Sequence, residues 1–487
     1  MGPDQSRMPL VEVMEAYLAE KTYRLHMPGH QGGQGAAEGL VHLLGQQAFK
    51  ADLTEIPGLD DLHQPQGAIK EAQMLAAAAY GAKESFFLVN GATAGIEAAF
   101  LAMLKPGDKV FLPRHAHRSV FNALVLSGAY PVYLNPRQHK ELSMPLGVDL
   151  KAWQQAFDAH PDGKAILLLH PSYEGVVSAD QELIDLTKSK GLKIIADEAH
   201  GGHFPFHPDL PLTALALGAD AVIQGSHKTS GSLTQSGFLH LGQGVDRVVF
   251  QDALGLVQST SPSYLLMASL DGARHQLAMK GRQALSKVQE ITAQIRKEIG
   301  LLKGFRTWYE ELYNDSVVKG VDFTKIILDG LDLGFSGYEL AAKLRTEAGI
   351  QVEMAANTFI LAMVGLGDNG GQQKRLIGAL QRIKGASHKK RALSAKNTLK
   401  VDYSNIPVLA ITPRNSFFAA KKTISLEDSV GEICGELVIP YPPGIPLLCP
   451  GEKISAEMVE QIKDLKGLGI SWQGLSDPSL NTIRILV

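Results

Sequence analysis

The stretch Gly225-Ser226-His227-Lys228-Thr229 decides the fold because of the residues that precede it. It follows the apolar run Asp220-Ala221-Val222-Ile223-Gln224, and an earlier run, Ile194-Ile195-Ala196, ends in Asp197-Glu198-Ala199-His200. Apolar runs without polar alternation are typical of strands that helices cover on both faces. Such strands form parallel sheets, whose ligands lie beyond the carboxyl ends of the strands. The sequence therefore predicts Lys228 and Asp197 at the ends of neighbouring strands.

The surrounding pattern alternates between helix and strand from about residue 68 to residue 242. This alternation predicts an α/β domain with a mainly parallel sheet. Helices are expected at 68–80, where Gly81 suits a left-handed C-terminal cap, and at 93–104. Strands are expected at 85–89, 109–112, 130–134, 165–169, 192–196, 220–223 and 237–241.

A smaller α/β lobe is predicted after this large domain. Residues 264–302 have helical spacing throughout, and a strand at 325–328, a helix at 338–348 and an apolar run at 358–364 follow. Residues 387–400 are basic and poor in apolar side chains, which indicates a linker or a solvated helix face. The expected organisation is 1–303 as N-terminal segment and large domain, 304–390 as small lobe and 391–487 as C-terminal domain.

Composition excludes several classes of protein. The 487 residues are 45% hydrophobic and 20% charged, as in ordinary globular α/β proteins. The formal net charge of -3 argues against non-specific binding of nucleic acid. Only two cysteines occur, so a disulfide framework is not expected and a reducing, cytoplasmic location fits. The N-terminus does not resemble a signal peptide, and no window approaches the roughly 20 apolar residues of a membrane span.

A glycine-rich turn, Val89-Asn90-Gly91-Ala92-Thr93-Ala94-Gly95, joins an expected strand to an expected helix. Small residues at a helix N-terminus let backbone N–H groups approach a phosphate, although an ordinary tight turn has the same appearance. Together with Lys228 and Asp197, this turn indicates pyridoxal phosphate. The amine of Lys228 would form a Schiff base with the aldehyde, and the carboxylate of Asp197 would keep the pyridine nitrogen protonated.

Histidines offer a competing interpretation as a metal site. His115, His117, His200, His203 and His207 include a His-x-His pair and lie near acidic residues in the sequence. A hydrolytic metal site would leave Lys228 and the glycine-rich turn without a role, so no metal is expected. His203 and His207 are interpreted as surface or loop histidines. The run His30-Gln31-Gly32-Gly33-Gln34-Gly35 follows no strand and is not a dinucleotide loop.

A set of further motifs occurs in a fixed order along nearly the whole chain. They are Met27-Pro28-Gly29-His30, Gly58-Leu59-Asp60-Asp61-Leu62-His63, Phe87-Leu88-Val89-Asn90-Gly91, Asp197-Glu198-Ala199-His200-Gly201, Ser226-His227-Lys228, Ser261-Pro262-Ser263-Tyr264, Thr412-Pro413-Arg414, Tyr441-Pro442-Pro443-Gly444-Ile445-Pro446 and Pro450-Gly451-Glu452. With these motifs the chain resembles the bacterial lysine/arginine/ornithine decarboxylases of pyridoxal phosphate fold type I, which is the aspartate-aminotransferase-like fold. The resemblance is to their short form, which has no N-terminal wing domain.

The resemblance implies a role for each matching residue. It implies that Lys228 is the Schiff-base lysine with His227 as its active-site neighbour, and that Asp197 contacts the pyridine nitrogen. The other implied cofactor contacts are His117 stacked on the ring, His200 beside it, and Ala92, Thr93 and Ser226 near the phosphate. Family members form dimers or higher multiples, in which residues 259–264 would reach the neighbouring subunit's cofactor.

The chain departs from its relatives in one motif and at three single positions. The usual Arg-Asn-x-His-Lys-Ser reads Arg114-His115-Ala116-His117-Arg118-Ser119 here. Relatives often have serine where Gly225 stands, arginine where Glu432 stands and aspartate where Asn415 stands. Glu174 and Glu432 are candidates for binding the cationic end of a substrate, although both could be solvent-facing carboxylates. Three functions stay open. They are decarboxylation of arginine, lysine or ornithine, another reaction of the same cofactor such as transamination or elimination, and a non-catalytic cofactor-binding homologue.

Overall fold

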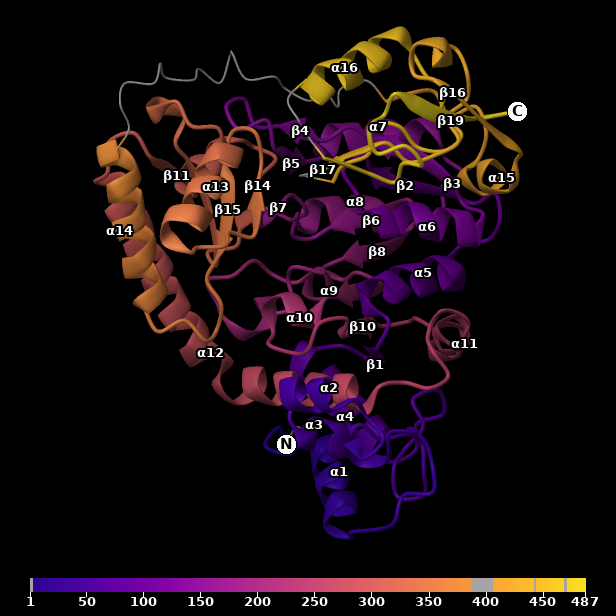
Figure 1. Ribbon diagram of the computed structural model, residues 1–487. Helices are drawn as coiled ribbons and strands as arrows, with labels where there is room; N and C mark the ends of the chain where they lie inside the picture. The colour runs from indigo at the N-terminus through magenta and orange to yellow at the C-terminus, as the bar shows by residue number, and fades with distance from the viewer. Residues whose placement is uncertain (1–2, 387–405, 442–443, 468–470) are drawn as a thin grey trace. The chain divides into compact units, whose positions relative to one another are not determined.

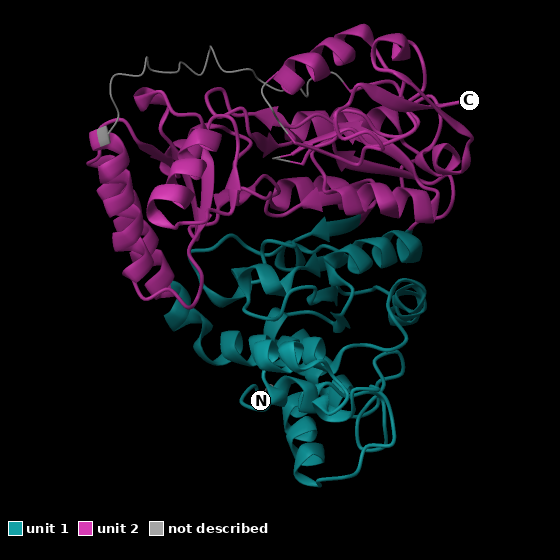
Figure 2. Ribbon diagram, viewed as in Figure 1, with its two compact units in different colours: residues 1–103, 194–285 teal, residues 104–193, 286–487 magenta. Residues whose placement is uncertain are grey.

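The computed structural model describes residues 3–386, 406–441, 444–467 and 471–487 (Figure 1). The chain folds into two compact units (Figure 2). Unit 1 comprises residues 1–103 and 194–285, and unit 2 comprises residues 104–193 and 286–487. The linker expected at 387–400 lies outside the described residues.

Unit 1 contains four adjacent strands in the order β1-β10-β9-β8. Their bounds are β1 Glu84–Leu88, β8 Lys193–Asp197, β9 Ala221–Gln224 and β10 Gly237–Leu241. β8 and β9 run parallel, as predicted, whereas β10 is antiparallel to both of its neighbours. All four β9 residues are buried, which explains its continuous apolar sequence.

Unit 1 contains long and short α-helices. They are α1 Pro9–Ala19, α2 Glu38–Leu44, α3 Gln46–Ala51, α4 Ala68–Tyr80, α5 Gly91–Met103, α9 Ala214–Leu217, α10 Ser226–Thr229, α11 Arg247–Val257 and the first part of α12 Tyr264–Gly300. The predicted C-cap of α4 is confirmed, because Gly81 is left-handed with φ of 72°. A Cβ at Gly95 would lie 2.7 Å from Leu88 and 2.8 Å from Ile223, so glycine lets α5 pack closely on β1 and β9.

Unit 2 contains three adjacent parallel strands in the order β6-β2-β3. Their bounds are β2 Lys109–Pro113, β3 Tyr130–Leu134 and β6 Ala165–Leu169, with α6 Arg118–Ser127, α7 Leu150–Ala159 and α8 Gln181–Ser189 as the neighbouring helices in the chain. Short strand pairs are formed by β4 Arg137–Gln138 with β5 Pro145–Gly147, and by β7 Val176–Val177 with β12 Gly320–Val321.

The predicted small lobe is a four-stranded antiparallel sheet in unit 2, in the order β11-β13-β15-β14. Its strands are β11 Arg306–Trp308, β13 Lys325–Asp329, β14 Met354–Ala355 and β15 Ile360–Met363. Helices α13 Gly337–Ala348 and α14 Gly371–Ala386 belong to it, and a complete capping box of Ser336 and Glu339 begins α13.

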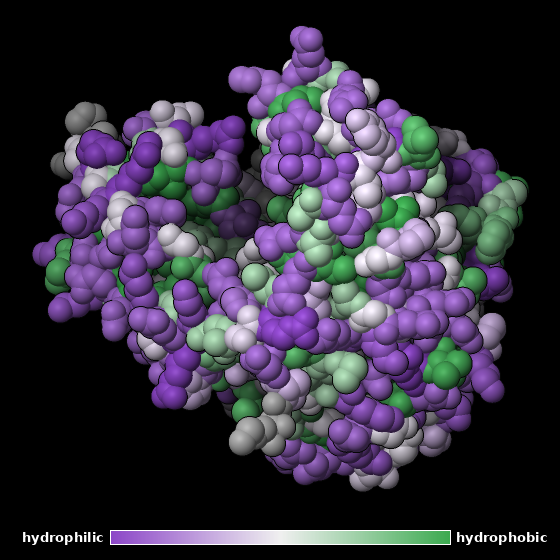
Figure 3. All heavy atoms as spheres, turned by 90° about the horizontal axis from the view of Figure 1, so that it is seen from below, coloured by the Kyte–Doolittle hydropathy of each residue, from purple (hydrophilic) through white to green (hydrophobic). Residues whose placement is uncertain are grey.

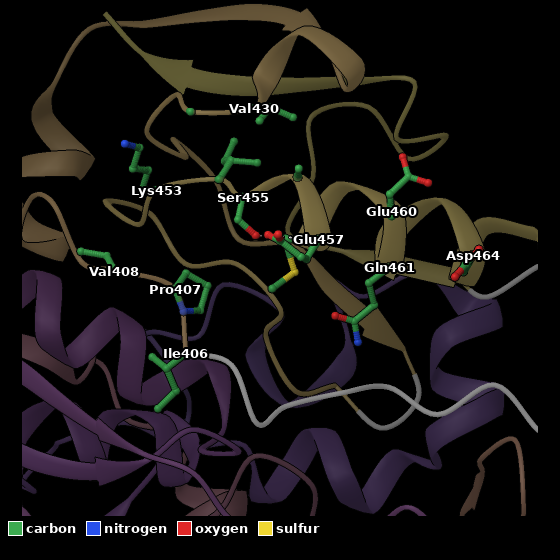
Figure 4. Close-up of a pocket in the computed structure, with 14 residues that line it drawn as sticks. Ile406, Pro407, Val408, Val430, Lys453, Ser455, Glu457, Glu460, Gln461 and Asp464 are labelled. Atoms are coloured by element: carbon green, nitrogen blue, oxygen red, sulfur yellow. Dashed lines mark hydrogen bonds between the residues drawn. The ribbon is translucent and has the colours of Figure 1, made fainter. Parts of the chain in front are cut away.

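The C-terminal part of unit 2 has its own apolar core, which includes Leu426, Cys434, Ile462 and Ile485. It contains α15 Pro413–Phe418, β16 Lys421–Ser425, β17 Ile439–Tyr441, α16 Ala456–Gly467, β18 Ser471–Gln473 and β19 Thr482–Leu486. A cavity of about 950 Å³ opens here between residues 406–408 and α16, and Glu457, Glu460 and Asp464 line its α16 side (Figure 4). The cavity contains none of the residues that the sequence assigned to the active site.

Hydrophilic residues predominate on the face of the molecule shown in Figure 3, and hydrophobic residues are scattered between them. None of the helices in the described ranges is both long enough and apolar enough to span a bilayer.

Candidate active site

Asp197 and Lys228 lie at the ends of neighbouring parallel strands in unit 1. Asp197 is the last residue of β8 and pairs in register with Ile223 of β9. β9 ends at Gln224, and the single-turn helix α10 then carries Lys228. The carboxyl ends of both strands therefore present these residues at the same edge, which is where ligands of such sheets bind.

The side chain of Lys228 lies beside His200, which the family resemblance also places next to the cofactor. Its Nζ lies 3.0 Å from Nε2 of His200. A Cβ at Gly225 would lie 2.9 Å from the carbonyl oxygen of Ala199 and 3.2 Å from Cδ of Lys228. Glycine at this position therefore lets the stem of Lys228 lie directly against the backbone, which gives the departure at Gly225 a steric reason.

Backbone groups also fix the side chains of Asp197 and His227 at this edge. The backbone N–H of Ala199 donates to Oδ1 of the buried Asp197 at 3.1 Å, which fixes the orientation of the carboxylate. Nδ1 of His227 lies 2.9 Å from the carbonyl oxygen of Ser236. Because a carbonyl oxygen only accepts, Nδ1 of His227 carries a proton and donates it.

The glycine-rich turn has the features expected of a phosphate site. Gly91, with φ of 76°, begins α5, and Ala92 and Thr93 lie in its first turn, where backbone N–H groups have no helical partner. Oγ of Ser226 is fully buried and has no hydrogen-bond partner among the described residues. An unpaired buried hydroxyl is costly unless a ligand satisfies it, so the residues present fit a bound phosphate group. Ser226 can supply the hydroxyl that Gly225 lacks.

His117 belongs to unit 2 and caps the N-terminus of α6. The backbone N–H of Ser119 donates to Nδ1 of His117 at 3.2 Å. Its predicted stacking on the cofactor ring stays a prediction.

The histidines of the competing metal interpretation do not form a cluster of ligands. Within residues 3–386, 406–441, 444–467 and 471–487, no group of three His, Cys, Asp or Glu side chains could hold a metal ion. Burial lowers the pKa of His115 to about 3, so its ring is neutral. Of the two alternatives expected for His203 and His207, surface or loop histidines, the structure supports the loop position. Both are buried in the loop after β8, where the ring of His203 packs against Phe204.

Glu174 and Glu432 have different surroundings within unit 2. Glu432 is exposed, as a solvent-facing carboxylate would be. Glu174 is only 2% exposed, so the solvent-facing alternative was wrong for this residue. Its Oε2 accepts a hydrogen bond from Oγ of Ser172 at 2.9 Å, and burial raises the pKa of the Glu174 carboxyl. Asn415, the third departure, lies in the first turns of α15, where its N–H donates to Oγ1 of Thr412.

Four residues beside this site were missed by sequence reasoning, namely Ser85, Glu198, Gln224 and His240. All four are buried and polar, and hydrogen bonds link their side chains across the strands of unit 1. The only signal in the sequence is that Glu198 directly follows Asp197 and that Gln224 ends the strand before Lys228.

Comparison with known proteins decides the family. The description "Orn/Lys/Arg decarboxylase, major domain" matches residues 8–372, and "Orn/Lys/Arg decarboxylase, C-terminal domain" matches residues 396–471. The chain belongs to the Orn/Lys/Arg decarboxylase family. It is therefore a decarboxylase of a basic amino acid that depends on pyridoxal phosphate, as the motifs in the sequence predicted.

Several named proteins are similar to this chain over almost its whole length. The chain is 36% identical to an arginine decarboxylase of Halalkalibacterium halodurans over 99% of this chain and 98% of that one. It is equally similar, with the same coverage, to an arginine decarboxylase of Bacillus subtilis. The structure of the constitutive lysine decarboxylase of E. coli matches with a TM-score of 0.85 at 19% identity, over 99% of this chain and 82% of that chain. These likenesses confirm the predicted fold type I.

Proposed function

We propose that this family member decarboxylates arginine and that Lys228 is the residue that binds the cofactor covalently. The observation that supports the site is the placement of Lys228 and Asp197 at the ends of two paired parallel strands. The choice of arginine rests on relatives named arginine decarboxylase that are 35–36% identical to the chain over 99% of its length. Pyridoxal phosphate, when bound, accepts the electron pair of the bond that breaks as carbon dioxide leaves.

The residues of the chain would divide the remaining tasks. The carboxylate of Asp197, oriented by the N–H of Ala199, would hold a proton at the pyridine nitrogen. Ala92, Thr93 and Ser226 would bind the phosphate, and His200 would lie beside the ring.

Proton return to Cα of the substrate is assigned to Lys228 or His227. Nδ1 of His227 donates to Ser236, so in a neutral ring Nε2 is the nitrogen that exchanges a proton. Nζ of Lys228 lies within hydrogen-bond reach of His200, through which it can change protonation state. His117, which would cover the ring face, completes the proposed set.

The test is an assay of purified, cofactor-saturated protein with arginine, lysine and ornithine in turn, with carbon dioxide and the product amine identified. Release of carbon dioxide from arginine in preference to the other two would support the proposal. Preference for lysine or ornithine would overturn the substrate assignment and leave the family untouched. A keto acid or an elimination product would favour the other reactions of the cofactor, and bound cofactor without turnover would indicate a non-catalytic homologue.

We also propose that the protein forms a homodimer or a higher homo-oligomer. Helix α2 buries none of its residues within the chain, and Leu43 on this helix is 76% exposed. The preceding segment exposes Tyr23 and Leu25 almost completely, at 98% and 94%. Apolar side chains gathered in one segment are typical of a surface that another subunit covers. The expected reach of residues 259–264 into a neighbouring subunit supports the same assembly.

We also propose a cellular context for the protein. A cytoplasmic location is supported by the two cysteines, which are buried and unpaired. A role in polyamine metabolism would follow from an amine product, and the net charge of -3 supports amino acids rather than nucleic acid as partners. We propose that the chain divides into its three domains after residues 303 and 390. The family domains, which match 8–372 and 396–471, support its second boundary.

A further inference from the structure

A chain of four buried side chains crosses the strands of unit 1 directly beside the proposed cofactor site. Oγ of Ser85 on β1 lies 2.7 Å from Nδ1 of His240 on β10. Nε2 of His240 lies 3.2 Å from Oε1 of Gln224, the last residue of β9. Nε2 of Gln224 lies 2.6 Å from Oε1 of Glu198, which directly follows β8. This hydrogen-bonded network therefore ends at the carboxyl ends of β8 and β9, next to Asp197 and Lys228.

The link between Glu198 and Gln224 joins the two segments that carry the proposed cofactor contacts. The backbone N–H of Glu198 donates to the carbonyl of Ile223 at 2.8 Å, and the N–H of Gly225 donates to the carbonyl of Ala199 at 3.2 Å. The second carboxylate oxygen of Glu198 accepts from the N–H of Ala214 at 2.7 Å. Movement of Gln224 would therefore displace the backbone on both sides of the site.

The three links between the four side chains can form in two ways. When Glu198 is ionised it only accepts, so Gln224 donates to it and accepts from Nε2 of His240, whose Nδ1 accepts from Ser85. When Glu198 is protonated the amide of Gln224 turns over, His240 changes tautomer and each of these bonds reverses. Burial lowers the pKa of His240 to about 3, so its ring is neutral and has one donor and one acceptor in either arrangement. The connection is thus retained whichever form Glu198 takes.

Among the described residues, no cationic side chain forms an ion pair with Glu198. In the part of the chain that the structure describes, this fully buried carboxyl accepts hydrogen bonds from the neutral groups of Gln224 and Ala214. A buried carboxyl without a cation lowers stability, and an apolar side chain would be the more stable choice. Its presence beside Asp197 indicates a task that an apolar side chain could not perform.

We propose that Glu198 and Gln224 are positioning residues of the cofactor site, and that His240 and Ser85 fix the orientation of Gln224. These residues would act through the backbone of 197–199 and 224–228, without touching the substrate or the cofactor. The proposal rests on the assignment of Lys228 and Asp197 as cofactor contacts. It goes beyond that assignment, because it names the groups that keep Lys228 and Asp197 in position relative to each other.

The experiment uses full-length Glu198→Ala, Glu198→Gln, Gln224→Leu and Ser85→Ala variants reconstituted with pyridoxal phosphate. The dissociation constant of the cofactor, the visible circular dichroism per bound cofactor and the melting temperature are measured for each. The circular dichroism reports the orientation of an achiral chromophore in its site, which a loss of overall stability alone would not change. Gln73→Leu is the matched control, because Gln73 is a buried glutamine of α4 outside the network.

Glu198→Ala and Gln224→Leu are expected to weaken cofactor binding about tenfold, as for loss of one buried hydrogen bond, and to change the circular dichroism. Glu198→Gln should restore both, since its amide and carbonyl can form the second of the two arrangements. Gln73→Leu should change the melting temperature only. If Glu198→Ala does not fold, Ser85→Ala tests the same proposal. It should show a smaller loss of cofactor affinity and a change of circular dichroism in the same direction.

Unchanged affinity and circular dichroism in Gln224→Leu and Ser85→Ala would overturn the proposal, whatever happens to the melting temperature. A failure of the underlying assignment has a different signature. In that case Lys228→Ala would still form a borohydride-reducible adduct with the cofactor, regardless of the network variants.

Discussion

His117 combines one observed task with one proposed task. Its Nδ1 accepts from the N–H of Ser119, as an N-cap residue should, so the proton of the neutral ring lies on Nε2. The same ring is the group proposed to stack on the cofactor. A side chain can cap a helix without an aromatic ring, and the two tasks can therefore be tested apart.

Replacement of His117 by asparagine and by alanine should distinguish capping from stacking. Asparagine is a strong N-cap residue, so His117→Asn should keep its stability, whereas His117→Ala should lose about 1 kcal/mol in free energy of unfolding. Both variants should bind pyridoxal phosphate about fivefold more weakly, because neither retains an aromatic face. Urea titration and cofactor titration measure the two effects. Wild-type affinity in His117→Asn would show that the ring does not contact the cofactor.

At the scale of the element, helix α6 is held at both ends by residues of the C-terminal part of unit 2. Arg114, just before His117, forms a buried two-pronged ion pair with Glu452 and donates to the carbonyl of Leu447 at 3.0 Å. At the other end, Arg414 donates to the carbonyls of Val125 and Leu126. The motifs around Arg414 and Glu452 therefore fix the helix that carries His117.

Glu452→Gln should lower the free energy of unfolding by about 3 kcal/mol or more, because the buried Arg114 would lose its counter-charge. The matched control is Glu460→Gln, which removes a carboxylate from the exposed pair with Lys463 and should leave stability unchanged. Urea unfolding of both variants at the same ionic strength is the measurement. Equal, small effects would show that Glu452 does not hold Arg114 in place.

The network at Glu198 predicts a pH dependence of stability. Burial raises the pKa of Glu198 from its ordinary value of 4.5 to about 8. Between these values the unfolded chain has released a proton that the folded chain retains, so this group lowers stability as pH rises. Its titratable neighbours His240 and Tyr80 stay neutral, since burial lowers the pKa of the first and raises that of the second.

Glu198→Gln cannot titrate, so its melting temperature relative to the wild type should rise steadily from about pH 5 to about pH 8. Thermal melts of both proteins across this range measure the difference. A difference that stays constant with pH would contradict a raised pKa for Glu198.

The elements were largely predictable from sequence because apolar periodicity determines which segments are buried. The strands expected at 130–134, 165–169 and 237–241 and the helix at 68–80 are confirmed with the same bounds. The antiparallel direction of β10 was not predicted, since a fully buried strand has the same apolar sequence in either direction. The hydrogen-bond network was missed because Ser85 and His240 are 155 residues apart in the chain. Burial of His203 and Glu174 depends on the packing of loops, which local sequence does not specify.

The motifs that indicated the family are distributed over the whole length of the chain. Lys228 and Asp197 lie in unit 1, whereas His117, Arg414 and Glu452 lie in unit 2. The order of motifs therefore predicted the family before any single residue could be assigned. Function in this proposal also requires a second copy of the chain, whose residues 259–264 would complete the site.

Leu43→Glu should shift the protein from dimer towards monomer and lower its specific activity, because α2 is proposed to lie in the subunit interface. Leu301→Glu is the control, since Leu301 is also 76% exposed but lies outside this segment. Light scattering after size-exclusion chromatography gives the mass of each variant. An unchanged dimer in Leu43→Glu, or a monomer in the wild type, would refute this interface.

The attachment of pyridoxal phosphate to Lys228, at the ends of β8 and β9, can be tested by identifying the lysine that carries the cofactor. The cofactor-loaded protein is reduced with borohydride and digested, and the modified peptide is identified by mass spectrometry. We expect a single pyridoxyl group on Lys228, and none in the Lys228→Ala variant, which should keep its fold. A pyridoxyl group on another lysine of the wild type, or one retained by the variant, would contradict this attachment.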